Sequence, residues 1–134
     1  LKAAVVSAGT ADGFVAREVT RSLTYMGWKS ERFEDCGVAG LWRITQALPA
    51  INACDAVVVI AGLDAALASV LGGLTDKPIF AVPTSVGYGV AQGGMTAMSS
   101  MLASCAPGVA VMILDNGYGA ACAVSRVFRA LTKS

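Results

Sequence analysis

Short apolar runs alternate along the chain with longer stretches in which apolar residues recur every three or four positions. The runs predict strands at 3–7, 30–33, 56–60, 78–82 and 109–114. The run at 56–60, AVVVI, is uninterrupted and rich in β-branched residues, which is typical of a strand buried on both faces. The run at 30–33 is short and polar, which indicates an edge strand.

The stretches between these runs predict helices at 12–26, 38–48, 64–74, 90–104 and 119–131. Gly27 stands where a glycine would end the first helix, and Pro49 is expected to stop the second. Strands separated by helices imply parallel βαβ units with right-handed crossovers. The pattern therefore predicts an α/β fold: a three-layer, doubly wound, flavodoxin-like sandwich with a parallel five-stranded sheet in the order 2-1-3-4-5.

The composition suits one domain over residues 1–134. Hydrophobic residues make up 55% of the chain, yet Gly, Pro, Asp and Lys interrupt every apolar run before it reaches the roughly 18 residues of a membrane span. We therefore expect no membrane contact, and we expect the surplus apolar surface to face other subunits. Because the first predicted strand starts almost at residue 1, we also expect the chain to be one domain of a longer protein.

Charge, cysteine and histidine content narrow the chemistry further. A formal net charge of +1 argues against a nucleic-acid partner, which would require many basic groups. The cysteines show no CxxC spacing and no secretory leader pattern is visible, so we expect free thiols and a cytoplasmic location. The chain contains no histidine, so acid–base catalysis would have to use Asp, Glu, Cys, Lys, Tyr or backbone groups.

Glycine, serine, threonine and aspartate are concentrated in the segments that follow the predicted strands. These segments are SAGTAD (7–12), DCGVAG (35–40), AGLDAA (61–66), VPTSVGYG (82–89) and LDNGYG (114–119). In doubly wound sheets, ligands bind beyond the carboxyl ends of the strands, where such segments meet. Glycines let the backbone approach a ligand, and N–H groups at helix starts attract phosphate. The segments together predict a site for a phosphorylated ligand, although ordinary turns and helix caps would explain each one alone.

Acidic residues follow four of the predicted strands, at Asp12, Asp35, Asp64 and Asp115. Each can be explained as a cap of a turn or helix, and Asn116 as a cap of the last helix. Asp12 and Asp64 face the predicted switch point between the first and third strands. Since Asp64 follows the most buried strand, its carboxylate could also serve as a base or as a metal ligand.

Five stretches together resemble one protein family. They are VVSAGTAD, DCGVAGLWR, VVIAGLDAALASVLGGLTDKPIFAVPTSVGYG, SCAPGVAV and LDNGYGAA. They are similar to the carboxylating domain of pyridinium-3,5-biscarboxylic acid mononucleotide synthase (LarB), a family related to the PurE carboxylases of purine synthesis. The resemblance covers residues 3–123, and VPTSVGYG is its most specific part. It implies a PurE-like carboxylase domain that forms the C-terminal part of longer family members.

The resemblance implies carboxylation of the pyridinium ring of nicotinic acid adenine dinucleotide, with hydrolysis of the phosphoanhydride and release of AMP. The product would feed synthesis of the nickel-pincer nucleotide cofactor. A cysteine that matches Cys105 would add to the ring, because thiolate addition converts an electron-poor pyridinium into an enamine-like nucleophile that can attack CO2. An acid that matches Asp64 would act as the base or activate water.

We expect the substrate to contact the segments described above and the arginine that follows the second of them. The residues are Ser7, Gly9, Thr10, Asp12, Asp35, Gly37, Gly40, Arg43, Gly62, Pro83, Thr84, Ser85, Gly87, Tyr88, Gly89 and Asn116. No tightly bound cofactor is expected. CO2 or bicarbonate would be a substrate, Mg²⁺ could take part, and the metal ligands are unknown. The resemblance implies a homo-octamer.

The chain departs from the family pattern in two places: Trp42 replaces a histidine, and Leu63 with Asp64 replaces Met-Glu. The predicted helix at 90–104 would span about 22 Å and would carry Cys105 to the far edge of its own sheet. We therefore expect that Cys105 either follows a break in this helix or enters the pocket of a neighbouring subunit.

Two other functions remain open from the sequence. One is an aminoimidazole ribonucleotide carboxylase or mutase of purine biosynthesis, which the missing histidine disfavours because PurE enzymes use a histidine as proton shuttle. The other is a nucleotide-binding assembly domain without turnover. Turnover that depends on Cys105 would distinguish the pyridinium carboxylase from the assembly domain without turnover.

Overall fold

The computed structural model describes residues 1–87 and 89–133. Its strands are β1 (Lys2–Ser7), β2 (Lys29–Phe33), β3 (Ala56–Ala61), β4 (Ile79–Pro83) and β5 (Val109–Val111). They form one sheet in the order β2-β1-β3-β4-β5, and every neighbouring pair is parallel. The predicted fold class and strand order are therefore confirmed.

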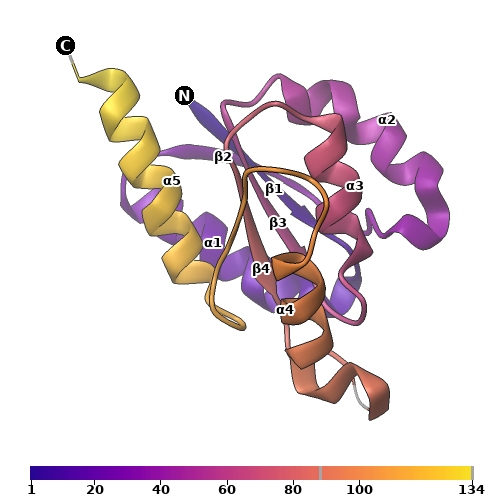
Figure 1. The fold of residues 1–134 in the computed structure, drawn as a ribbon. Coiled ribbons are helices and arrows are strands. Elements are labelled where there is room, and N and C mark those ends of the chain that lie inside the picture. Colours follow the sequence, from indigo (N-terminus) through magenta and orange to yellow (C-terminus); the bar gives the residue numbers. More distant parts are fainter. Residues whose placement is uncertain (88, 134) are drawn as a thin grey trace.

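Helices cover both faces of this sheet. They are α1 (Gly13–Tyr25), α2 (Leu41–Asn52), α3 (Ala66–Leu74), α4 (Met95–Leu102) and α5 (Gly117–Thr132), with short 3-10 turns η1 (Thr10–Asp12), η2 (Val38–Gly40) and η3 (Gly89–Gly94). Helices α1 and α5 lie on one side of the sheet, and α2 and α3 lie on the other (Figure 1). Helix α4 lies on the same side as α2 and α3, because its buried residues belong to the same core cluster.

The alternation of side chains along each strand creates two cores. On β1, Ala3 and Val5 face the core under α1 and α5, while Ala4 and Val6 face the core under α2, α3 and α4. Every residue of β3 is buried, which confirms the interpretation of AVVVI as a strand covered on both faces. Because both faces of the sheet are occupied by helices, a ligand can reach the sheet only at its ends.

Several predicted boundaries are wrong. Helix α2 does not stop near Pro49 but continues to Asn52, since Ile51 is fully buried in the core and holds the last turn in place. Helix α3 starts two residues later than predicted, because Leu63 and Ala65 adopt left-handed backbone angles, with φ near 55°. Strand β5 ends at Val111 instead of 114.

The predicted helix at 90–104 is broken. Gln92, Gly93 and Gly94 have positive φ angles, so η3 is separated from the eight-residue helix α4. Within residues 1–87 and 89–133, no helix combines the length and the hydropathy that a membrane crossing requires.

Candidate functional site

A cavity of about 890 Å³ opens at the carboxyl ends of the strands. Its walls come from the loops after β1, β2 and β3 and from the connection between β4 and α4. This is the switch point of the doubly wound sheet, where β1 and β3 lie side by side and their following helices cover opposite faces. Six of the predicted contact residues line the cavity, together with the predicted catalytic residue Asp64: Gly9, Thr10, Asp12, Gly37, Arg43 and Gly62.

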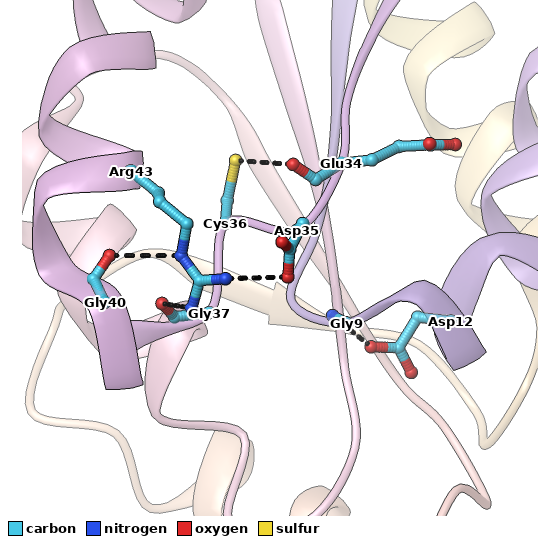
Figure 2. A network of polar contacts seen from close by, with 8 residues as sticks. All are labelled: Gly9, Asp12, Glu34, Asp35, Cys36, Gly37, Gly40 and Arg43. Atoms are coloured by element: carbon cyan, nitrogen blue, oxygen red, sulfur yellow. Dashed lines mark hydrogen bonds and ion pairs between the residues drawn. The ribbon is translucent and has the colours of Figure 1, made fainter.

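Arg43 is held in place by the loop that precedes its own helix (Figure 2). Its Nη1 lies 2.8 Å from a carboxylate oxygen of Asp35, its Nη2 donates to the carbonyl of Gly37 at 3.1 Å, and its Nε donates to the carbonyl of Gly40 at 3.4 Å. A guanidinium group has five N–H donors, so two remain for a ligand. The three contacts fix the charge on the cavity wall, which favours an anionic ligand group such as a phosphate.

Asp12 is buried, with only 4% of its surface exposed, and it ties two loops together. Its carboxylate accepts hydrogen bonds from the amide of Gly9 at 3.0 Å and from the hydroxyl of Thr84 at 2.8 Å. Of the two kinds of cap expected for Asp12, the structure shows the cap of a turn: the side chain reaches back to the start of η1 and makes no capping bond to α1. Burial raises the pKa of Asp12, while the bonds from Thr84 and Gly9 act in the opposite direction.

Gly62 is required where the loops after β3 and β4 approach each other. A Cβ atom on Gly62 would lie 2.6 Å from the hydroxyl oxygen of Thr84 and 2.9 Å from the carbonyl oxygen of Val86. Similarly, a Cβ on Gly37 would lie 2.9 Å from the carbonyl oxygen of Ala8. The cavity thus depends on glycine for close backbone packing at these two positions.

Left-handed backbone angles outside glycine occur, within the described residues, only in the segments that follow strands. Asp35, Leu63, Ala65, Gln92 and Asp115 have φ angles between 52° and 59°. Such conformations cost about 1–3 kcal/mol each and persist only where the surrounding structure imposes them. Four connections form the cavity walls, namely those after β1, β2, β3 and β4. The connections after β2, β3 and β4 each contain at least one of these residues.

Other predicted contact residues support the cavity without lining it. Pro83 and Thr84 are buried at the end of β4, and Ser7 is buried at the end of β1, where its hydroxyl has no hydrogen-bond partner among the described residues. Asn116 caps α5 by accepting the amide hydrogen of Gly119 at 2.9 Å, as the sequence predicted. Asp115 instead accepts the amide hydrogen of Ser85 at 2.9 Å.

Four of the five predicted segments contribute to the cavity wall, and no residue of the loop after β5 lines it. Asp35 and Gly40 act through Arg43. Gly87 and Gly89 lie in the connection after β4 but outside the cavity lining, and Tyr88 lies outside the described residues.

Cys105 and Asp64 are not brought together within one chain. Asp64 precedes α3 at the carboxyl edge, where its carboxylate accepts the amide hydrogen of Ala66 at 3.2 Å. Cys105 is exposed and lies between α4 and β5, at the amino end of a parallel strand. The neighbouring Ala106 packs against Gly72 in the last turn of α3, which confirms that this segment lies at the opposite edge of the sheet.

Residues that the sequence analysis did not predict as ligand contacts complete the cavity wall. They include the apolar residues Leu63, Val86, Val90 and Ala91, together with Thr96. Leu63 and Val90 are large apolar residues that are 59% and 89% exposed, respectively. Their positions beside glycine in two of the polar loops were the only available signal. Among the described residues, no three His, Cys, Asp or Glu side chains lie close enough together to hold a metal ion.

Comparison with known proteins supports the fold and leaves the activity open. No family model matches the chain. Uncharacterized protein MJ0165 of Methanocaldococcus jannaschii is 40% identical over 121 residues, which is 89% of this chain and 46% of the relative. The chain therefore spans about half the length of the relative it matches.

Two crystal structures are similar over 98% of this chain, each with a TM-score of 0.79: Treponema denticola PurE, at 18% identity, and a variant of Treponema denticola PurE2, at 19%. The chain covers 82% of the first and 81% of the second. At these identities the likeness shows the fold alone. The chain thus has the fold of PurE, with a cavity at the sheet edge where a doubly wound protein binds its ligand.

Proposed function

We propose that this chain is a PurE-like carboxylase that acts on a nucleotide, and specifically on the pyridinium ring of nicotinic acid adenine dinucleotide, as LarB enzymes do. The observation that carries the proposal is the anchored guanidinium of Arg43 on the wall of the switch-point cavity. A charge held by three protein contacts and keeping two free donors suits a phosphate group. The loops rich in glycine allow the sugar-phosphate part of a nucleotide to lie against the backbone.

The proposed reaction needs a thiolate, an acceptor for a proton and bound CO2. The thiolate of Cys105 adds to the pyridinium ring, and the electron-rich ring carbon then forms a C–C bond with CO2. Asp64 is the candidate acceptor for the ring proton, and departure of the thiolate breaks the C–S bond and restores aromaticity. Hydrolysis of the phosphoanhydride, with release of AMP, would be a separate step at the same site.

Cys105 would come from a neighbouring subunit in this proposal. Its exposed position at the opposite edge of the sheet makes it accessible to a second copy of the chain. We expect a cytoplasmic homo-octamer as the working form, with bicarbonate as the source of CO2 and with the substrate phosphates as ligands of Mg²⁺. Light scattering would measure the assembly.

The direct test is incubation with nicotinic acid adenine dinucleotide, bicarbonate and Mg²⁺, followed by mass spectrometry of the products. The expected result is a carboxylated mononucleotide and AMP from the unsubstituted protein, and neither from Cys105→Ala. Cys122→Ala is the matched control, since Cys122 is on α5 and is not among the residues that line the cavity. Product formation by Cys105→Ala would rule out the thiolate mechanism.

Co-expression of two inactive variants tests the origin of the thiolate. Cys105→Ala lacks the nucleophile, and Arg43→Gln lacks the phosphate contact. If each cavity uses the thiol of a neighbouring subunit, mixed assemblies will contain some cavities with both groups and will recover part of the activity. No recovery would mean that both groups act within one subunit.

Aminoimidazole ribonucleotide carboxylation is a second candidate, because the two similar crystal structures are PurE proteins. The absence of histidine from this chain disfavours it. The same assay with aminoimidazole ribonucleotide separates the two candidates. Binding of a nucleotide without turnover of either substrate would support a non-catalytic nucleotide-binding domain instead.

A further inference from the structure

Trp42 lies at the start of α2, beside the cavity residue Arg43, and is not itself part of the cavity lining. It is 64% exposed, although it directly precedes Arg43, which lines the cavity. The guanidinium carbon of Arg43 lies 5.7 Å from the centroid of the indole ring. A Cβ on Gly40 would lie 2.8 Å from the ring of Trp42 and 2.7 Å from Nε of Arg43, so this glycine lets both side chains fold over the loop.

The other tryptophan of the chain shows what a structural indole looks like here. Trp28 donates its indole N–H to the hydroxyl of Ser125 at 2.9 Å and packs edge-to-face on Phe128, with ring centroids 5.2 Å apart. No side-chain hydrogen bond among the described residues involves the indole N–H of Trp42. Since Trp42 is neither buried nor hydrogen-bonded, its contribution to folding is small, and its exposed ring is available to an aromatic ligand.

The neighbouring charge indicates which aromatic group fits. Arg43 already interacts with the electron-rich face of the indole. A ring with a positive nitrogen would be repelled by this guanidinium, whereas adenine carries no charge and stacks on any aromatic face. The same guanidinium has free donors for the phosphates that adjoin the adenosine. A base on Trp42 and a phosphate on Arg43 are therefore compatible with one bound nucleotide.

We propose that Trp42 is the stacking platform for the adenine base of a dinucleotide whose phosphates contact Arg43. This inference rests on the proposed function and extends it, because it makes Trp42 the residue that distinguishes an adenine dinucleotide from a pyridinium mononucleotide. The pyridinium end would then lie deeper, toward Asp64 and the loop after β3.

Calorimetric titration of the full chain with three probes tests the inference: nicotinic acid adenine dinucleotide, AMP and nicotinic acid mononucleotide. Trp42→Leu is expected to weaken binding of the dinucleotide and of AMP by about fivefold to a hundredfold, the usual contribution of one stacked base. Binding of the mononucleotide should change by less than about twofold. Trp42→Phe should restore most of the affinity, because it keeps an aromatic face.

Leu102→Ala is the matched control, because Leu102 is 69% exposed at the end of α4 and its loss also removes exposed apolar surface. An unchanged affinity of Trp42→Leu for the dinucleotide overturns the inference, as does an equal loss for all three probes or a loss confined to the mononucleotide. If the assembly mass of Trp42→Leu changes and its affinity for all three probes falls equally, Trp42 is a subunit contact.

The failure of this inference can be distinguished from the failure of the proposed function. If the unsubstituted protein turns over the dinucleotide while Trp42→Leu binds it normally, only this inference fails. If the unsubstituted protein binds none of the probes, the proposed function fails as well.

Discussion

Two concavities of similar size differ in how they are built. The switch-point cavity measures about 890 Å³, and a groove between α1 and α5 measures about 780 Å³. The groove is lined by Arg21, Ser22, Tyr25, Met26, Tyr118, Cys122, Ser125, Arg126 and Arg129. It is rich in cationic side chains, whereas the cavity has a single arginine among loops of small residues.

The cavity and the groove differ in how firmly protein contacts hold their arginine side chains. Arg43 has three protein contacts, while none of the groove arginines forms an ion pair within the described part of the chain. Arg129 lies in the last turn of α5, where positive charge complements the helix dipole and therefore has a structural explanation. A preorganised charge loses less conformational entropy when it binds a ligand. Volume alone thus does not identify the site, but anchored side chains and strained backbone do.

The largest effect is expected from Gly62→Ala, which would break the contact between two cavity loops. The new methyl group would collide with the Val86 carbonyl and displace Thr84 from Asp12. We expect the free energy of unfolding to fall by about 2–4 kcal/mol, as measured by chemical denaturation. Gly73→Ala is the control, since a Cβ at Gly73 meets no atom within 4 Å and alanine stabilises a helix by about 0.5–1 kcal/mol. Equal effects of the two substitutions would contradict the proposed close packing.

Arg43→Gln should weaken AMP binding by about tenfold to a hundredfold, because a charge-assisted hydrogen bond contributes about 1.5–3 kcal/mol. Arg126→Gln removes a groove arginine and should change the affinity by less than about twofold. Titration calorimetry at constant salt measures both. A larger loss from Arg126→Gln would make the groove, and not the cavity, the nucleotide site.

Thr84→Val should destabilise the protein by about 1–2 kcal/mol at neutral pH, because it removes a hydrogen bond to the buried carboxylate of Asp12. The folded-state pKa of Asp12 is raised, so the folded protein binds more protons than the unfolded chain between the two pKa values. The stability contribution of this group is therefore largest at low pH and falls as pH rises through that interval.

Removal of the Thr84 hydroxyl should raise the pKa of Asp12 further. The stability difference between Thr84→Val and the unsubstituted protein should then increase as pH rises above about 4, the ordinary pKa of an aspartate. Thr84→Ser keeps the hydroxyl and should show little pH dependence of this difference. Denaturation curves between pH 4 and pH 8 measure it, and a difference that shrinks with rising pH would contradict the assignment.

The mildest perturbation is thiol labelling of the native protein. Cys105 is exposed and should react first, followed by the half-buried Cys122 in the groove. Cys36 and Cys54 are buried, and burial raises the pKa of both thiols, so they should react only after unfolding. Mass spectrometry of the labelled peptides gives the order. Early labelling of Cys36 would show that the loop behind the cavity opens readily.

The arrangement of the sheet could be predicted because it follows from local patterns. A strand covered on both faces needs a continuous apolar run, as in β3, and an edge strand tolerates the polar run of β2. Gly27, with a φ of 87°, ends α1 where the sequence indicated. Right-handed crossovers then leave few possible strand orders.

The side chains of the candidate site could be predicted as a set, but their pairing could not. Asp12 and Thr84 are separated by 72 positions and meet only because β1, β3 and β4 are in register. A break in the helix at 90–104 was one of two alternatives that the sequence offered for Cys105, but its position could not be predicted, because nothing local requires Gln92 to adopt a left-handed angle. Such features are imposed by contacts between distant loops, which outweigh a local cost of about 1–3 kcal/mol.

The sequence by itself determined the secondary structure elements, the two buried faces and the edge of the sheet at which a ligand can bind. The tertiary structure alone decided that Arg43 is fixed by its preceding loop, that Asp12 is buried beneath Thr84, and that Cys105 lies at the opposite edge from Asp64. The physical reason is separation along the chain. Hydrophobic periodicity is a pattern among residues that are close in sequence, whereas hydrogen-bond partners and strained backbone angles depend on how the complete core positions its loops.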